Sequence, residues 1–252
     1  MDILELERRL LPLGIGTVGF SLIDSTSSEA KRRALAGLAS STLFIAEEQT
    51  AGRGRMGRSF FSPADTGLYL SLLFPVGEDS LKIVGITSAA AVAAVRAIRS
   101  ETGIETGIKW VNDIYLGSRK IAGILAESFF VGEKRFCIVG IGVNLTTENS
   151  DFPSELRNSA GSLMTQGDIR TSLAAVFCEE LWGLVSALPD KSFMEEYRAA
   201  SVVIGQEITF LENGAQYSAI AKKVCDDGSL EVVLDSGESR VLSSGEISLR
   251  LK

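Results

Sequence analysis

The sequence predicts a fold of the α/β class in its α+β form, with a mixed α/β domain followed by a small β-barrel. Up to about residue 200, strand-like apolar runs are interrupted only in places by helical segments, which favours a mixed sheet over strict alternation. Beyond that point, short β-rich runs are separated by turns such as Asn213-Gly214 and Asp227-Gly228, which are strong hairpin signals. We therefore expect one domain over residues 1–200 and a second over residues 201–252.

Helices in the larger domain are expected where apolar residues recur at helical spacing or where alanine is abundant. These segments are residues 2–10, 26–38, 81–100, 169–188 and 191–200. Thr26-x-x-Glu29 predicts a capping box at the start of the second helix.

Strands in the larger domain are expected where apolar runs are bounded by turn residues. These segments are residues 17–23, 42–46, 68–74, 109–116, 120–130 and 135–145. Pro75 is expected to end the third of them. The smaller domain is expected to contain strands over residues 207–211, 217–225, 230–234, 238–242 and 247–251.

Composition excludes several classes of chemistry. The chain contains no histidine, which excludes Ser-His-Asp and Cys-His catalysis and histidine-bound metals. Its three cysteines, Cys137, Cys178 and Cys225, are far apart and form no CxxC pair, which argues against a disulfide framework or a zinc site. The net charge of -7 disfavours non-specific binding to nucleic acid.

The N-terminal residues have neither the basic start nor the uninterrupted apolar core of a signal peptide, and the longest apolar runs are too short to cross a bilayer. We therefore expect no membrane partner and a cytoplasmic location.

A loop rich in glycine and arginine follows Gln49 and has the sequence Gly52-Arg53-Gly54-Arg55-Met56-Gly57-Arg58. Glycine lets the backbone approach a ligand closely, and arginine presents a fork of donors that suits carboxylate and phosphate oxygens. The loop is neither a P-loop nor a GxGxxG motif. Its pattern fits an anion-binding loop, and the alternative is a solvated surface loop.

A second candidate site combines Lys109-Trp110-Val111-Asn112-Asp113 with the segment 119–127. A strand–turn–strand would bring Lys109 and Lys120 together beside the carboxylate of Asp113. Two ammonium groups and a carboxylate suit a triphosphate and its Mg²⁺. An ordinary polar hairpin with exposed lysines is the alternative.

Two shorter segments are also candidates. Ser25-Thr26-Ser27 follows a predicted strand and could bind a ligand or simply cap a helix. Gly140-Ile141-Gly142-Val143-Asn144 could pass close to a ligand or form a tight bend.

In this order and spacing, these segments together resemble the biotin–protein ligase family, whose members are also called biotin–[acetyl-CoA-carboxylase] ligases. The resemblance extends from about residue 14 to the end of the chain. It implies a class II synthetase-like catalytic domain followed by an SH3-like β-barrel. The chain departs from the family pattern at Ser27, Phe60 and Val111, where asparagine, tryptophan and proline are usual.

The resemblance implies a two-step reaction with biotin as substrate. Biotin and ATP, with Mg²⁺, would give biotinyl-5′-AMP, and the biotinyl group would then pass to a lysine of a biotin carboxyl carrier protein. Positioning and charge neutralisation would carry the first step, because two anions must be joined.

Residue roles implied by the resemblance are as follows. The expected biotin-binding residues are Ser25, Thr26, Ser27, Gln49, Gly52, Arg53, Gly54, Arg55, Lys120 and Gly123. The expected ATP-binding residues are Arg53, Arg55, Arg58, Lys109, Trp110, Asn112 and Asn144. The expected catalytic residues are Lys120, Arg55 and Lys109, and Asp113 is expected to help hold Mg²⁺.

Three other functions stay open at this point: a lipoate–protein ligase, a non-catalytic biotin or nucleotide sensor, and an RNA-binding module built on the arginine loop. Part of the family has an N-terminal winged-helix domain that binds DNA. Only 24 residues precede Ser25, so we expect no DNA partner. Between a monomer and a homodimer, we favour the homodimer.

Overall fold

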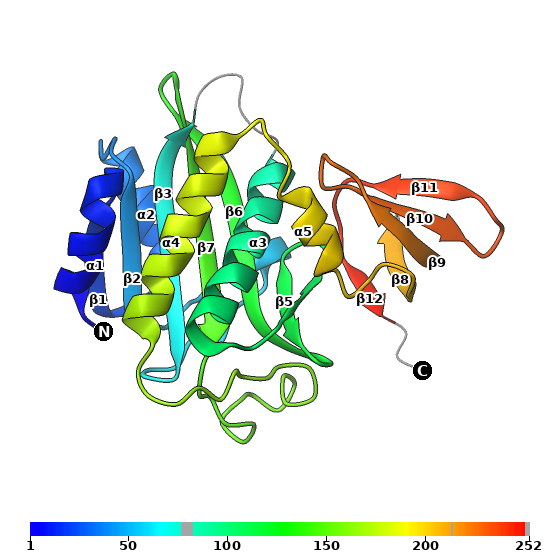
Figure 1. The fold of residues 1–252 in the computed structure, drawn as a ribbon, viewed down its shortest axis with the longest axis horizontal. Coiled ribbons are helices and arrows are strands. Elements are labelled where there is room, and N and C mark those ends of the chain that lie inside the picture. The colour runs from blue at the N-terminus through cyan, green and yellow to red at the C-terminus, as the bar shows by residue number, and fades with distance from the viewer. Residues whose placement is uncertain (77–82, 213, 250–252) are drawn as a thin grey trace.

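The structure is a computed structural model that describes residues 1–76, 83–212 and 214–249. A large mixed sheet with helices packed against it is followed by a smaller antiparallel sheet, which lies at one end of the molecule (Figure 1). The predicted α/β class, with a mixed-sheet domain followed by a β domain, is confirmed.

The large sheet has the strand order β1-β2-β3-β7-β6-β5-β4. Its strands are β1 (Gly16–Ile23), β2 (Thr42–Gln49), β3 (Gly67–Val76), β4 (Gly107–Lys109), β5 (Asp113–Leu116), β6 (Arg119–Val131) and β7 (Lys134–Asn144). β1 and β2 pair in parallel, whereas the remaining neighbours pair antiparallel. The central strands β3 and β7 are almost entirely buried because helices and loops cover both of their faces.

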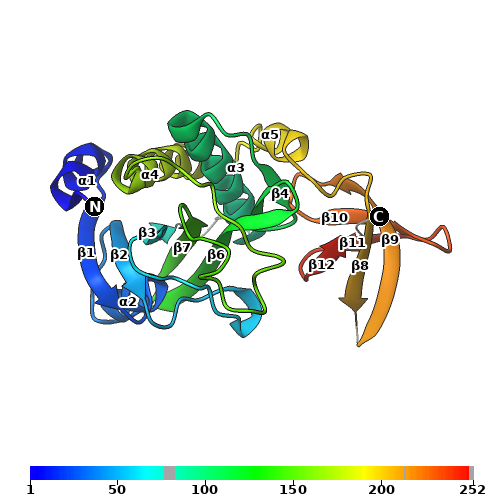
Figure 2. The ribbon, with the colours of Figure 1, turned by 90° about the horizontal axis from the view of Figure 1, so that it is seen from below.

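Helices cover the two faces of the large sheet unequally. One face carries α1 (Ile3–Leu10), α3 (Ile83–Thr102), α4 (Arg170–Ala187) and α5 (Met194–Ala199), and the other carries α2 (Thr26–Leu35) (Figure 2). The many alanines of α3 are buried and let it pack closely on its neighbours. Within the described residues, no helix is long and apolar enough to cross a membrane.

The small sheet is antiparallel and has the order β11-β10-β9-β8-β12. Its strands are β8 (Glu207–Glu212), β9 (Ala215–Val224), β10 (Leu230–Leu234), β11 (Ser239–Leu242) and β12 (Ile247–Leu249). The predicted turn at Asn213 and the last two residues of the predicted strand 247–251 lie outside the described residues, as do residues 81 and 82 of a predicted helix.

The predicted capping box at Thr26 is wrong by one residue. Ser25 has an extended backbone, and its side chain accepts a hydrogen bond from the Ser28 amide, so Ser25 is the N-cap of α2. The Thr26 hydroxyl is engaged elsewhere, and Glu29 pairs with arginines of its own helix.

Two strand predictions are also corrected. Pro75 does not end β3 but continues it and pairs with Phe136 of β7. The predicted strand 109–116 is two antiparallel strands, β4 and β5, with a turn at residues 110–112. A register shift between Ile114 and Tyr115 accompanies the pairing of β5 with β6.

Candidate functional site

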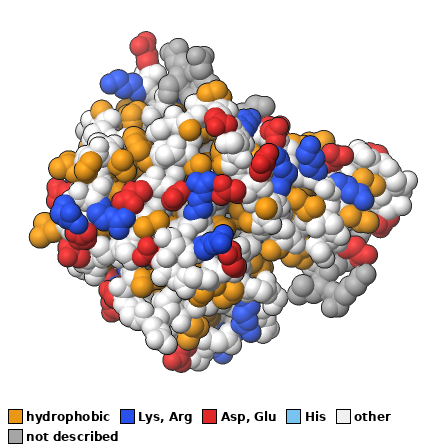
Figure 3. Space-filling view, in the orientation of Figure 1, with side chains coloured by type: hydrophobic (Ala, Val, Ile, Leu, Met, Phe, Trp, Pro, Cys, Tyr) orange, Lys and Arg blue, Asp and Glu red, His pale blue; other side chains and the backbone are white. Residues whose placement is uncertain are grey.

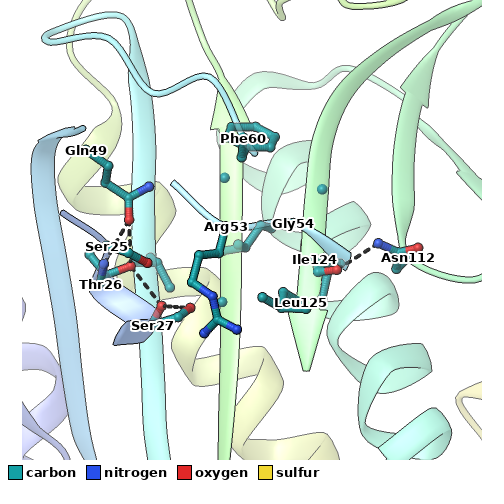
Figure 4. Close-up of a pocket in the computed structure, with 16 residues that line it drawn as sticks. Ser25, Thr26, Ser27, Gln49, Arg53, Gly54, Phe60, Asn112, Ile124 and Leu125 are labelled. Carbon is teal, nitrogen blue, oxygen red and sulfur yellow. Dashed lines mark hydrogen bonds between the residues drawn. The ribbon is translucent and has the colours of Figure 1, made fainter. Parts of the chain in front are cut away.

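A pocket rich in hydroxyl groups lies beside the N-terminus of α2, between that helix, the arginine loop and the central strands (Figure 4). We call it the hydroxyl pocket. It is lined by Ser25, Thr26, Ser27, Gln49, Arg53, Gly54, Phe60, Leu70, Ser71, Asn112, Gly123, Ile124, Leu125, Gly140, Ile141 and Gly142. Polar groups from α2 and β2 therefore face apolar residues and glycines of β3, β6 and β7.

The polar side of this pocket is a chain of hydrogen bonds. The backbone amide and the hydroxyl of Thr26 both donate to Gln49 Oε1, at 2.9 and 3.1 Å. Thr26 Oγ1 also lies 2.8 Å from Ser71 Oγ, which in turn lies 2.8 Å from Ser27 Oγ. Ser71 is fully buried in β3, so its hydroxyl holds the side chains of Thr26 and Ser27 from the sheet.

Glycines leave room along the pocket wall. A Cβ atom at Gly142 would lie 2.4 Å from the ring of Phe60, and one at Gly140 would lie 2.8 Å from Ser27 Oγ. A Cβ at Gly123 would lie 3.1 Å from Lys120 Nζ. Side chains at these positions would therefore displace either the aromatic ring, a hydroxyl or the lysine.

The arginine loop is held in place by three arginines that reach three different parts of the molecule. Two of the contacts are bidentate, and the pairs are Arg53 with Glu127, Arg55 with Asn112, and Arg58 with Glu246. The Arg53 bonds are both 2.8 Å long, and the Arg55 bond is 3.0 Å long. The loop is thus joined to β6, to the β4–β5 turn and to the segment before β12.

A second cavity of about 260 Å³ shares Phe60 with the hydroxyl pocket. We call it the lysine cavity. It is lined by Arg58, Phe60, Phe61, Lys109, Asp113, Tyr115, Lys120, Asn144, Phe152, Leu156, Ser159, Ala160 and Glu246. Three cations and several aromatic or apolar side chains therefore line one space, which suits a ligand with an anionic end and a flat ring.

Lys120 and Lys109 occupy different environments in the lysine cavity. Lys120 Nζ lies 2.7 Å from Asp113 Oδ1, so its ammonium group has a carboxylate partner. Burial lowers the pKa of Lys109 below its ordinary value, and the nearby Asp113 carboxylate opposes this shift. Lys109 Nζ lies 3.4 Å from the hydroxyl of Tyr115, and burial raises the pKa of that phenol to about 12.

Two further cavities meet at Lys109. One adjoins the arginine loop and is lined by Arg55, Met56, Arg58, Lys109, Trp110, Asn112, Asp113, Gly245, Glu246 and Ile247. The other, of about 490 Å³, lies where the two sheets meet and also shares Tyr115 and Ser159 with the lysine cavity. We call it the junction cavity, and it continues the lysine cavity toward the C-terminal domain.

The turn between β4 and β5 is fixed by distant parts of the chain, although Val111 stands where the family usually has proline. The indole nitrogen of Trp110 donates to the carbonyl of Gly228 at 2.8 Å, and the hydroxyl of Tyr197 donates to the carbonyl of Val111 at 3.1 Å. Asn112 Nδ2 donates to the carbonyl of Ile124 at 2.8 Å. Lys109 and Asp113 are therefore held at the two ends of an anchored turn.

The structure distributes the predicted site residues between these spaces. Most of the residues expected to bind biotin line the hydroxyl pocket: Ser25, Thr26, Ser27, Gln49, Arg53, Gly54 and Gly123. Of the others, Gly52 adjoins Gln49, Arg55 lines the cavity beside the arginine loop, and Lys120 lies in the lysine cavity. The residues expected to bind ATP line the cavities around Lys109, except Arg53. Trp110 is 4% exposed and mainly anchors the C-terminal domain.

Four residues that shape the site were not predicted from the sequence: Ser71, Tyr115 and Glu246 line the cavities, and Glu127 holds the arginine loop through Arg53. Glu127 ends the segment 119–127 that was singled out, and it could have been noticed as a partner for the arginine loop. Ser71 lies within an apolar strand, and Glu246 lies 188 residues from Arg58, so neither had a local signal.

The residues present fit a magnesium ion carried by a nucleotide. Mg²⁺ in such sites is bound by one or two carboxylates, water and phosphate oxygens. Asp113 and Glu246 both line the cavity that also holds Arg58 and Lys109. Asp113 is paired with Lys120 and Glu246 with Arg58, so either carboxylate would share its oxygens between a cationic side chain and the ion.

Comparison with known protein families gives two matches. The family described as "Biotin/lipoate A/B protein ligase family" matches residues 19–144, which is half of the 252-residue chain. The "Biotin protein ligase C terminal domain" matches residues 203–250.

Similar proteins agree with this assignment. The biotin–[acetyl-CoA-carboxylase] ligase of Mycobacterium tuberculosis is 32% identical, over 88% of this chain and 85% of its own length. A bifunctional ligase/repressor of Bacillus spizizenii is 40% identical over 56% of this chain but only 44% of its own length. The chain thus matches less than half of that relative.

Solved structures provide the same match at the level of the fold. The biotin protein ligase of Aquifex aeolicus in complex with biotin and ATP has a TM-score of 0.76 and 25% identity, and the match covers 94% of this chain and 99% of that one. The chain belongs to the biotin/lipoate A/B protein ligase family.

Proposed function

We propose that this protein is a biotin–protein ligase that activates biotin with ATP and transfers it to a lysine of an acceptor protein. The main support for the proposal is that the hydroxyl pocket and the lysine cavity, which differ in chemistry, adjoin each other. The polar hydroxyl pocket suits a small ring with donors and acceptors, whereas the lysine cavity suits a nucleotide, and the two adjoin at Phe60 and Gly123.

In the first step, a carboxylate oxygen of biotin attacks the α-phosphorus of ATP, and the bond to the pyrophosphate oxygen breaks. Biotinyl-5′-AMP and pyrophosphate are the products. Repulsion between the two anions is the main obstacle, and positioned cations lower it. Lys120 lies beside Gly123 at the boundary between the two spaces, so its ammonium group is the one that would meet both anions.

Arg58 and Lys109 would neutralise the remaining phosphates, because both line the lysine cavity and the space beside the arginine loop. Asn144 and Phe152 would contact the nucleoside. Asp113 would bind the Mg²⁺ that ATP carries, and this ion would add positive charge at the phosphates.

In the second step, the neutral amine of an acceptor lysine attacks the carbonyl carbon of biotinyl-5′-AMP. The bond to the phosphate oxygen breaks, AMP leaves, and the amine loses a proton. The closed arginine loop would shield the mixed anhydride from water. We propose a biotin carboxyl carrier protein as the acceptor, which is supported by the name of the Mycobacterium tuberculosis relative.

Lipoate is the alternative substrate, since the family includes ligases for both acids. The dithiolane ring of lipoate has no hydrogen-bonding groups, whereas the ureido ring of biotin has two donors and an acceptor. Ser25, Thr26, Ser27 and Gln49 line the pocket with polar groups, with which a dithiolane could form no matching hydrogen bonds. This chemistry favours biotin.

We propose the domain division at residues 200 and 201, supported by the family match that begins at residue 203, and an SH3-like fold for the second domain. Cytoplasmic location, the homodimer and the lack of a DNA partner stay predictions. An RNA-binding role is disfavoured because acidic and basic side chains alternate on the face shown in Figure 3, without a continuous basic area there.

The test is exchange of labelled pyrophosphate into ATP by the purified protein with Mg²⁺ and either biotin or lipoate. Exchange that depends on biotin is the expected result. Exchange with lipoate alone would place the chain among the lipoate ligases, and exchange with neither acid would favour a non-catalytic sensor.

A further inference from the structure

The hydrogen-bond chain beneath the hydroxyl pocket has a fixed direction, which follows from counting its protons. Gln49 is oriented by two independent contacts. Its Oε1 accepts from the Thr26 backbone amide at 2.9 Å, and its Nε2 donates to Ser62 Oγ at 3.0 Å. The Ser62 hydroxyl donates its own proton to the carbonyl of Phe60 at 3.0 Å, so Ser62 Oγ is an acceptor toward Gln49.

Three oxygen–oxygen contacts then remain, and each needs one proton. They join Thr26 to Gln49 at 3.1 Å, Thr26 to Ser71 at 2.8 Å, and Ser71 to Ser27 at 2.8 Å. Gln49 Oε1 has no proton to donate, so the three protons must come from the hydroxyl groups of Thr26, Ser71 and Ser27, one from each. Thr26 must donate to Gln49, which makes Ser71 donate to Thr26 and Ser27 donate to Ser71.

This arrangement fixes what each hydroxyl can offer a ligand. The proton of Ser27 points away from the ligand space toward Ser71, so Ser27 presents only lone pairs to the pocket. Thr26 likewise has no proton left to donate. Ser27 is 5% exposed and Ser71 is fully buried, so no bulk water supplies an alternative partner for Ser71.

We propose that Ser71 is a positioning residue for substrate selection: by accepting a hydrogen bond from Ser27, it makes Ser27 a hydrogen-bond acceptor that requires an N–H group on the ligand ring. This inference rests on the proposed function and concerns how the same site chooses its acid. A cyclic urea supplies an N–H toward Ser27. A cyclic carbamate, in which oxygen replaces one ring N–H, would direct a lone pair at another lone pair.

Crowding around the two serines keeps the arrangement from relaxing. A Cβ atom at Gly140 would lie 2.8 Å from Ser27 Oγ and 3.2 Å from Ser71 Oγ, so the glycine leaves space for these hydroxyls and little more. Thr26 and Ser27 both belong to the first turn of α2, whose backbone is fixed by the Ser25 cap. The Ser27 hydroxyl can therefore change direction only if Ser71 stops accepting its hydrogen bond.

The experiment measures dissociation constants for biotin and for its two cyclic carbamate isomers by titration calorimetry, in the wild-type protein and in Ser71→Ala. The wild-type protein should bind one isomer roughly 10- to 100-fold more weakly than biotin, which is the usual cost of an unpaired buried polar group. In Ser71→Ala, the Ser27 hydroxyl is free to turn and donate. The discrimination against that isomer should then fall about tenfold, while the ratio for the other isomer stays unchanged.

Two further variants separate this effect from packing. Ser71→Cys keeps a side chain of similar size but accepts a hydrogen bond poorly, so it should also lose discrimination. Ser62→Ala breaks the same network at its other end without touching the proton of Ser27, and it should retain wild-type discrimination. If Ser71→Ala does not fold, Ser71→Cys against Ser62→Ala gives the same comparison.

Three results would overturn the proposal: equal discrimination in the wild-type and Ser71 variants, an equal loss for both isomers, or an equal loss in Ser62→Ala. With biotin-dependent pyrophosphate exchange intact, any of these would leave the proposed ligase function standing. A wild-type protein that binds no biotin would overturn both proposals.

Discussion

The ammonium group of Lys120 lies 2.7 Å from the Oδ1 atom of Asp113, so the lysine expected to meet both substrates is held by the carboxylate expected to bind magnesium. Asp113 in β5 pairs with Gly123 of β6, whereas Lys120 of β6 pairs with Tyr115. The side chains of Lys120 and Asp113 are 34% and 23% exposed. Because both side chains are partly buried, their attraction is screened less than it would be in bulk water. Asp113 therefore both orients the lysine and lies among the cations that line the lysine cavity.

We expect Lys120→Ala to slow biotin-dependent pyrophosphate exchange by about 10²- to 10³-fold, which is typical of removing one positioned group that stabilises developing charge. Asp113→Asn should also slow exchange, because Lys120 loses its partner and Mg²⁺ loses the carboxylate expected to bind it. Lys31→Ala, on the surface of α2, is the matched control. Normal exchange in Lys120→Ala would rule out its assigned role.

The bidentate pair of Arg53 with Glu127 should govern how well the arginine loop retains the activated intermediate. In Glu127→Gln we expect biotinyl-5′-AMP to dissociate up to about fivefold faster, because a partly exposed ion pair contributes no more than about 1 kcal/mol. Release of labelled adenylate from a preformed complex measures this rate.

The double variant Arg53→Glu/Glu127→Arg provides the check on that mechanism. It restores the opposite charges with their positions exchanged, and it should release the adenylate more slowly than Arg53→Glu or Glu127→Arg alone. Equal release rates in the wild type, the single variants and the double variant would show that the ion pair has no influence on how the loop retains the adenylate.

The contact between Arg58 and Glu246 joins the arginine loop to the C-terminal domain, and both residues line the lysine cavity. Arg58→Ala leaves an unpaired carboxylate there, so it should raise the KM for ATP both by losing a cation and by exposing ATP to Glu246. Arg58→Ala/Glu246→Gln should recover about fivefold of this loss, corresponding to roughly 1 kcal/mol for an exposed charge pair. A KM identical in the single and double variants would exclude repulsion by Glu246.

The lowered pKa of Lys109 predicts a dependence on pH. The charged form of Lys109 is the one that attracts phosphate, so kcat/KM for ATP should fall as pH rises through this lowered pKa. Arginine stays protonated in this range, so Lys109→Arg should move the fall to higher pH, although its absolute rate is expected to be lower. The pH profile of pyrophosphate exchange, measured for both proteins, decides the point. If the activity of the wild type and of Lys109→Arg falls over the same range of high pH, a group other than Lys109 is responsible.

Local features of the sequence determined much of this site. Glycines and arginines between Gly52 and Arg58 predict a ligand-binding loop, and residues of this loop line the hydroxyl pocket and the cavity beside it. The strand–turn–strand around Lys109 and Lys120 predicts that the two lysines come together. Both line the lysine cavity. Such signals are readable because they depend on residue type and on spacing within one hairpin.

Sheet order and the packing of the two domains decided the rest. Ser71 meets Ser27 across 44 positions of sequence, and Glu246 reaches Arg58 across 188. Ser71 is a small residue within a buried apolar strand, so its sequence context gives no sign of a polar partner. Which hydroxyl donates to which was also beyond the sequence, because a proton's direction depends on every acceptor around it, and only the folded chain brings those acceptors together.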